Sequence, residues 1–207
     1  TLAGLPVNAA VTLPNTPLQA GSRVPPNIML ILDDSGSMAD TQMDTPLITI
    51  NNNANQELNS VAYTSNSLYY NPAVNYRPWR NGDGTYMADA SYNSAFNDAN
   101  LTTHPIDLGG SNRFFYVPIN PLVVGNTTDY YRYQFKTDGT ADRCERTFAG
   151  SWAWRNCVAQ VNFTWAGPVT RTLAEEKLKF ATWYAFHRTR IKTAKAARGC
   201  AFDALGK

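Results

Sequence analysis

The sequence of 207 residues has few charges and no long apolar run. Charged side chains make up 16% of the residues and the formal net charge is +2. This balance argues against a dedicated nucleic-acid binder, because such a protein needs a basic surface for the phosphates. The longest apolar run, 28–32, is far shorter than the roughly 18 residues of a membrane span, so we predict no span. The start of the chain lacks the regions of a signal peptide, and it fits a mature secreted or a trimmed N-terminus equally well.

Cysteine and histidine are also scarce, with three and two copies. No pair of these residues has the spacing of a structural zinc site. Cys144 and Cys157 lie in a stretch that we interpret as a loop, and a bridge between them would stabilise the fold by about 3 kcal/mol on the chain-entropy model. Cys200 falls in a helical segment, where it is either a buried thiol or paired outside this chain. This cysteine usage favours an oxidising compartment.

The residues of a catalytic site are not recognisable. Neither His104 nor His187 stands near a Ser or Cys nucleophile in a catalytic context. No base or oxyanion arrangement accompanies the Asp and Ser residues of the chain. We therefore predict that the protein is not an enzyme and that both histidines are structural.

Aromatic side chains, by contrast, are plentiful. Hydrophobic residues reach 43%, which is enough for a core, and aromatic residues reach 12%, with eleven Tyr and five Trp. Many aromatics with few charges are common in extracellular binding surfaces and also in β-rich folds. Tyr76, Trp79, Trp152 and Trp154 could stack on sugars or on a protein partner. Packing against their own loops is the commoner role of such side chains, and we predict it here.

A cluster of oxygen-bearing side chains follows the apolar run. Asp33, Ser35 and Ser37 alternate, and Gly36 allows a tight turn between the two serines. We predict a buried strand over 27–33, so that the alternating carboxylate and hydroxyls converge where the strand curls into a loop. An all-oxygen set suits Mg²⁺, Mn²⁺ or Ca²⁺ rather than zinc or copper. The alternative is a polar turn that merely ends the strand.

The rest of the sequence divides into segments of different character. Residues 1–26 are extended and rich in proline, and residues 27–39 hold the first strand and the metal loop. Residues 40–170 lack helical periodicity, and we interpret them as a β- and loop-rich insertion. A turn is predicted at Asp138-Gly139. Strands rich in aromatic and β-branched residues are predicted over 113–119, 130–136 and 158–165.

A helix is predicted in the last segment, 171–207. Thr172 and Glu175 fit a capping box at its start. Basic residues gather in its later part, in agreement with the helix dipole, and apolar residues recur at helical spacing. Gly199 either kinks or ends this helix. We interpret the arginines and lysines as a solvated face.

The loop at residues 33–37 resembles the Asp-x-Ser-x-Ser signature of von Willebrand factor A domains, where it forms the metal-ion-dependent adhesion site. Such a domain runs from the metal loop directly into an amphipathic helix. Here the segment that looks like the middle of that helix, 192–198, comes far later in the chain. A large insertion at this point is typical of the N-terminal region of the PilY/PilC family, the type IV pilus tip-associated adhesins. The chain resembles this family in four segments in the same order: 15–18, 24–38, 70–79 and 180–190.

This resemblance implies both a fold and a function. The fold is α/β, a partial von Willebrand A (Rossmann-like) unit with its first strand and first helix, interrupted by the insertion. The function is that of an extracellular bacterial protein at the pilus tip, which binds minor pilins, supports pilus assembly and adheres to a host-cell or abiotic surface. The divalent cation, Mg²⁺ before Mn²⁺ or Ca²⁺, is held by Asp33, Ser35 and Ser37. An acidic group of the partner completes its shell.

The sequence departs from a complete A domain in its extent. Such a domain has further strands and takes a Thr and an Asp of its metal site from two later loops, whereas this sequence ends at Lys207. The resemblance therefore implies an N-terminal fragment or a processed piece that supplies only part of the site. We expect weak or no metal binding by this chain alone. A second hypothesis is a structural scaffold that docks on minor pilins independently of metal.

Overall fold

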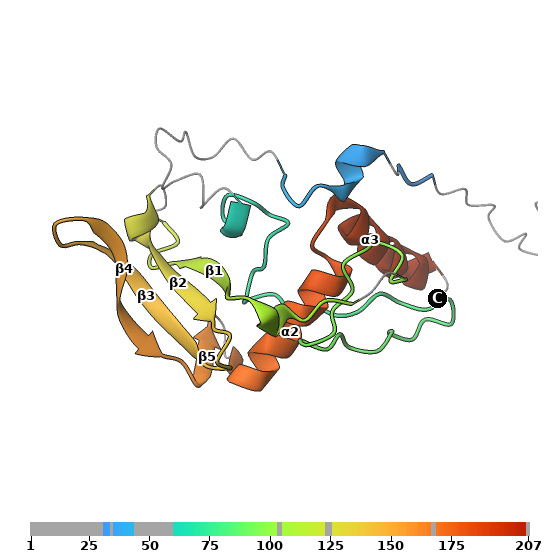
Figure 1. Cartoon of the computed structure of the whole chain (residues 1–207). Coiled ribbons are helices and arrows are strands. Elements are labelled where there is room, and N and C mark those ends of the chain that lie inside the picture. Colours follow the sequence, from blue (N-terminus) through green and yellow to red (C-terminus); the bar gives the residue numbers. More distant parts are fainter. Residues whose placement is uncertain are drawn as a thin grey trace, which may run out of the picture. The chain divides into compact units, whose positions relative to one another are not determined.

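A four-stranded antiparallel sheet organises the fold (Figure 1). The computed structural model describes residues 31–33, 35–43, 60–102, 105–122, 126–166 and 169–205. The chain divides into two units, Thr1–Ile31 and Leu32–Lys207, and the elements named below belong to the second. The 3-10 helices are η1 (Gly36–Ala39), η2 (Leu108–Gly110) and η3 (Thr127–Asp129). The strands and α-helices are β1 (Arg113–Pro118), β2 (Tyr130–Phe135), β3 (Ala141–Phe148), β4 (Trp152–Ala159), β5 (Asn162–Trp165), β6 (Val169–Thr172), α2 (Leu173–Phe186) and α3 (Arg190–Leu205).

Two of the three predicted strands are confirmed as single strands. β1 and β2 begin at Arg113 and Tyr130, as expected, and each ends one residue earlier than predicted. Neighbouring strands pair antiparallel in the order β1-β2-β3-β4. The predicted turn at Asp138-Gly139 joins β2 to β3, and Gly139 adopts a φ of +87° there, a conformation that favours glycine. This part of the sheet follows from local sequence signals.

The third predicted strand, 158–165, is divided in the structure. Its beginning is the end of β4, and its last residues form β5. The stretch 143–157 belongs to β3 and β4, so its interpretation as a loop is wrong. Cross-strand pairs such as Arg146 opposite Trp154 stabilise this hairpin, and such pairs are not visible in the propensity of either strand alone.

A disulfide between Cys144 and Cys157 joins β3 to β4, and the bridge considered from the sequence is confirmed. The register of the two strands shifts at this point, where β4 places two residues opposite one of β3. One of the two, Asn156, has a φ of +51°, which Asn tolerates better than most residues. The bridge therefore closes the hairpin beside a β-bulge.

The two-stranded sheet β5–β6 leads directly into helix α2. Thr172 is the last residue of β6 and also the N-cap of α2. Its hydroxyl accepts from the Glu175 amide, and the Glu175 carboxylate accepts from the Thr172 amide. The predicted capping box is confirmed, and it fixes the point at which the chain turns from strand to helix.

The single helix predicted over 171–207 is wrong, because residues 187–189 separate α2 from α3. Thr193 donates its hydroxyl proton to the His187 carbonyl just after α2. The Thr189 hydroxyl accepts from the Lys192 amide in the first turn of α3. These two threonines satisfy backbone groups that helix ends leave open, and this stabilises the break. The helical spacing of apolar residues alone does not show whether such a segment forms one helix or two.

Gly199 does not end the helix, since α3 continues to Leu205. A Cβ atom at Gly199 would lie 3.3 Å from the Cβ atom of Arg80. Glycine therefore allows close packing of α3 on the segment around Arg80 rather than helix termination.

An aromatic core joins the sheet to α2. Phe115 of β1 is fully buried and stacks on Tyr133 of β2, with ring centroids 5.5 Å apart. Phe180 of α2 lies 5.5 Å from Phe135 of β2, measured between centroids. Tyr70, which precedes the sheet in sequence, lies 5.0 Å from Phe115 and 5.1 Å from Phe180. Strand, helix and loop segments thus share one core, and large aromatic side chains dominate its burial.

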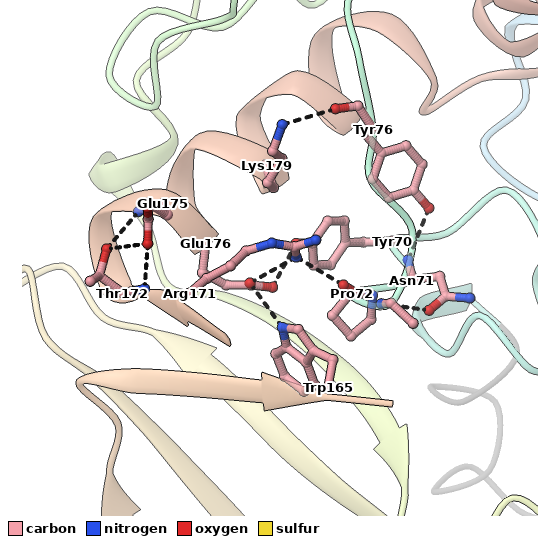
Figure 2. A network of polar contacts seen from close by, with 11 residues as sticks. Tyr70, Asn71, Pro72, Tyr76, Trp165, Arg171, Thr172, Glu175, Glu176 and Lys179 are labelled. Carbon is pink, nitrogen blue, oxygen red and sulfur yellow. Dashed lines mark hydrogen bonds and ion pairs between the residues drawn. The ribbon is translucent and has the colours of Figure 1, made fainter. Parts of the chain in front are cut away.

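A charged network is buried beside this core (Figure 2). The fully buried Glu176 of α2 accepts hydrogen bonds from the Tyr70 hydroxyl at 2.6 Å and from the Trp165 indole N–H at 3.0 Å. Arg171 of β6 pairs with the same carboxylate at 3.1 Å and donates to the carbonyl of Pro72 at 2.8 Å. The network therefore connects β5, β6 and α2 to the loop that precedes the sheet.

The described fold is mixed α/β with an antiparallel sheet, so the coarse fold class is confirmed. Residues 1–26 and most of the predicted first strand, 27–30, lie outside the described residues. Ile31, Leu32 and Asp33, at the end of that predicted strand, are not in a strand. Among the described residues, no helix is long and apolar enough to cross a bilayer.

Replacing Glu176 by Gln should lower the free energy of unfolding by about 3 kcal/mol, because the buried Arg171 then loses its counter-charge. Urea unfolding followed by tryptophan fluorescence measures the loss. Glu175→Gln, at the neighbouring exposed position, is the matched control: glutamine keeps the acceptor of the capping box, and the lost charge at the helix N-terminus should cost only about 0.5 kcal/mol. Equal losses in the two variants would contradict the importance of the buried pair.

Candidate metal-binding loop

The three predicted metal ligands lie together on an exposed loop. Asp33 and Ser35 precede η1, and Ser37 is the second residue of η1. Ser35 Oγ lies 2.9 Å from Asp33 Oδ2 and 3.2 Å from Ser37 Oγ. The Ser35 amide also donates to Asp33 Oδ1 at 2.8 Å. The structure thus brings one carboxylate and two hydroxyls to one place. Asp34 lies outside the described residues.

Backbone hydrogen bonds close the loop. The Met38 amide donates to the Ser35 carbonyl at 2.9 Å, and the Asp40 amide donates to the Ser37 carbonyl at 3.2 Å. A Cβ atom at Gly36 would meet nothing within 4 Å, and the φ of Gly36 is not in the left-handed region. The turn itself therefore does not require glycine, contrary to the sequence expectation.

The Asp33 carboxyl is held in its ionised form. The Ser35 amide and then the Ser35 hydroxyl donate to it, and these bonds keep the pKa of Asp33 below its usual value. An ionised carboxylate beside two hydroxyls is a set of hard oxygen donors, and Mg²⁺, Mn²⁺ and Ca²⁺ prefer such donors. The chemistry of the three side chains fits a divalent cation.

Two other turns show which part of this geometry is unusual. The carboxylate of Asp83 accepts from the amide and hydroxyl of Thr85, and that of Asp138 accepts in the same way from Thr140. A plain polar turn therefore accounts for the contact between Asp33 and Ser35. The third oxygen, from Ser37, is what distinguishes the loop and favours a metal site.

The segment that leaves the loop, Asp40 to Met43, is bound to two distant parts of the chain; we call it the exit segment. The Arg190 amide donates to the Asp40 carbonyl at 3.1 Å, and Arg190 Nε donates to the Gln42 carbonyl at 3.0 Å. Asn66 donates to the Thr41 carbonyl at 2.9 Å. Arg190 is the first residue of α3, so its bond to Asp40 brings the end of the loop to this helix. η1 and α3 are in contact (blue and dark red in Figure 1).

Helix α3 and the break before it are in turn fixed by three basic side chains that bind one loop, residues 96–100. Lys192 is fully buried, and its Nζ donates to a carbonyl of this loop at 3.1 Å and to the Tyr184 carbonyl at 3.2 Å. Arg188 and Lys195 donate to the same loop. Their interpretation as a solvated face is therefore wrong, because buried N–H groups need acceptors and the loop carbonyls provide them.

The remaining candidates do not form a second site among the described residues. The one group of His, Cys, Asp and Glu side chains close enough for a metal is Asp142 with Cys144 and Cys157, and the two cysteines are joined in the disulfide. His187 Nε2 lies 2.7 Å from the Arg77 carbonyl, which is a structural contact. His104 lies outside the described residues, as does the side chain of Cys200.

The four singled-out aromatics divide into packed and exposed side chains. Tyr76, Trp79 and Trp154 are partly buried and pack against the aromatic clusters of the fold. Trp152 is 54% exposed and lies 5.5 Å from the 63% exposed Phe148, measured between ring centroids. Packing is therefore the role of three of them, whereas Trp152 forms an exposed pair with Phe148 where β3 turns into β4.

Comparisons with known protein families, with curated proteins and with solved structures found no match to this chain.

The sequence pattern singled out Asp33, Ser35 and Ser37, which the structure brings together, but it missed the residues that hold the loop in place. Arg190 and Asn66 act through backbone groups of Asp40 to Met43, and such long-range hydrogen bonds leave no local signal. One available clue was the position of Arg190, directly after a break that two threonines cap. A helix start predicted at this break would place Arg190 in the first turn of the helix.

Burial lowers the pKa of Lys192 from an ordinary value of 10.5 to about 7, and the nearby Arg188 acts in the same direction. The folded state therefore binds fewer protons than the unfolded state between these two pH values, so stability rises with pH across that window. The charged and titratable groups facing Lys192 include Arg188, Lys195, Asp98, Tyr184 and His187.

The free energy of unfolding should therefore increase from pH 7 to about pH 9 in the wild-type chain. Lys192→Met should flatten this increase, because the shifted group is gone. Lys179→Met, a change of the same kind on α2, should keep it. Urea midpoints measured in steps of pH provide the comparison. An undiminished increase in Lys192→Met would assign the pH dependence to another group.

Proposed function

We propose that this protein is an extracellular bacterial adhesin of the type IV pilus tip, in which the loop at 33–37 binds a divalent cation. The observation that carries the proposal is the cluster of three side chains in which Ser35 Oγ lies 2.9 Å from Asp33 Oδ2 and 3.2 Å from Ser37 Oγ. Four sequence segments that resemble the PilY/PilC family in the same order add support. The protein acts by binding rather than by catalysis.

The position of the loop supports the insertion that this family resemblance requires. In a von Willebrand A domain the metal loop runs straight into the first helix. Here Asp40 follows the loop and Arg190 begins α3, and the two residues are hydrogen bonded at 3.1 Å. The segment between them therefore starts and ends at the same place, as an insertion between loop and helix must. On this account the first helix of the A domain is α3, and α2 belongs to the insertion.

The cation then links the protein to its ligand. Asp33, Ser35 and Ser37 would hold Mg²⁺ before Mn²⁺ or Ca²⁺, and a bound divalent ion supplies a Lewis-acidic point for a carboxylate of the partner. The chain's own residues bind and orient: the Ser35 bonds keep Asp33 ionised, and η1 fixes Ser37 beside Ser35. Adhesion to a host-cell or abiotic surface would depend on the cation.

Asp33→Ala should abolish the binding of Mn²⁺, a sensitive substitute for Mg²⁺ that electron paramagnetic resonance detects even when binding is weak. Asp83→Ala is the matched control, because Asp83 makes the same two bonds to a hydroxyl residue but has no counterpart of Ser37. The control should bind as the wild type does. Retained binding in Asp33→Ala would overturn the metal role, and no binding in the wild type would show that Asp33, Ser35 and Ser37 do not hold the ion by themselves.

A scaffold that docks on minor pilins without metal is the second candidate. The exposed pair Phe148 and Trp152 favours it, because exposed aromatics are enriched at protein interfaces. A pull-down with minor pilins in excess chelator separates the two functions. If the minor pilins still capture the protein in chelator but not its Trp152→Ser variant, the result supports the scaffold. If the minor pilins capture the protein only with Mg²⁺ present, the result supports the metal-dependent adhesin.

A further inference from the structure

The exit segment is held by a backbone contact at every residue. Arg190 binds the Asp40 and Gln42 carbonyls, and its guanidinium lies 4.0 Å from the Asp40 carboxylate. Asn66 donates to the Thr41 carbonyl and accepts from the Met43 amide at 3.2 Å. The backbone amide and side chain of Arg190 and the side chain of Asn66 therefore bind four consecutive residues.

Asn66 and Arg190 are themselves fixed by other parts of the fold. Asn66 is fully buried, and it also donates to the Ser60 carbonyl at 3.0 Å and accepts from the Leu68 amide at 3.2 Å. Arg190 begins a helix that the buried Lys192 fixes within its first turn. The exit segment is therefore attached to rigid parts of the fold.

The exit segment gains little from burial. Thr41, Gln42 and Met43 are all exposed, and exposed residues contribute little apolar area to offset the entropy of ordering their backbone. Hydrogen bonds from Arg190 and Asn66 are therefore a principal cause of its conformation. η1 ends at Ala39, directly before this segment. The bonds that fix the exit segment therefore also fix the orientation of η1.

We infer that the Arg190 side chain positions the metal loop: through its bond to the Gln42 carbonyl and its ion pair with the Asp40 carboxylate it holds Ser37 beside Ser35 and Asp33 for a divalent cation. This inference rests on the proposed metal function. A preorganised set of ligands binds more tightly, because the loop is ordered before the ion arrives. The planar guanidinium suits the task, since it presents donors in a fixed geometry that a lysine lacks.

The test compares the wild type with Arg190→Gln and with Arg198→Gln, an exposed arginine on the same helix. Mn²⁺ binding is measured by electron paramagnetic resonance, and amide hydrogen exchange is measured without metal. Arg190→Gln keeps the backbone amide but removes the Nε donor to Gln42, and it should weaken Mn²⁺ binding about tenfold because the loop is then less preorganised. It should also speed exchange over residues 36–43 and leave the aromatic core protected. Arg198→Gln should match the wild type in both measurements.

The outcomes separate the positioning role from the metal function. Mn²⁺ binding that is equal in wild type and Arg190→Gln overturns the positioning role and leaves the metal function standing. Absence of binding in the wild type overturns metal binding by this chain alone, and the role of Arg190 in ordering the loop is then decided by exchange alone. Unchanged exchange over 36–43 in Arg190→Gln contradicts that ordering role in either case. Loss of protection in the core as well would mean that the variant disturbs the whole fold and would also count against a local role.

Discussion

The buried ion pair between Arg171 and Glu176 is the constraint on which the arrangement of the elements depends. Two charges in an apolar surrounding are tolerated only when their hydrogen-bonding capacity is satisfied, and here Tyr70, Trp165 and Pro72 provide the partners. Tyr70 and Pro72 belong to the loop that precedes the sheet and Trp165 to β5, so satisfying the pair requires that loop, strand and helix meet in one way. An aromatic core by itself tolerates repacking; a buried charge with fixed donors favours a single arrangement.

The order imposed by this pair extends along the chain to the metal loop. Glu176 fixes the start of α2, and the threonine-capped break after α2 sets where α3 begins. The buried Lys192 then binds α3 to the loop at 96–100, and Arg190 at the first turn of α3 binds Asp40. An exposed loop with little burial of its own is thereby positioned by a core that is distant in sequence. On the proposed account, the insertion has a part in shaping the adhesion site.

Local signals in the sequence predicted the elements that depend on local chemistry. The Asp138-Gly139 turn, the Thr172 capping box and the oxygen donors of the loop could all be read from neighbouring residues. The β3–β4 hairpin, the helix break and the buried roles of Glu176 and Lys192 could not, because each depends on partners far away in the chain. A lysine in a basic stretch has the same local appearance whether it faces water or the carbonyls of a distant loop. The von Willebrand-like fold and the pilus function remain proposals from the resemblance.

The central claim is that the end of the metal loop and the start of α3 are joined. Its most direct measurement is hydrogen exchange at the Arg190 amide, resolved by NMR. The first amides of a helix have no acceptor within the helix, so protection there reports the bond to the Asp40 carbonyl. The account predicts an Arg190 amide that exchanges far more slowly than in an unstructured peptide. Exchange at the unstructured rate, with the interior of α3 still protected, would contradict it.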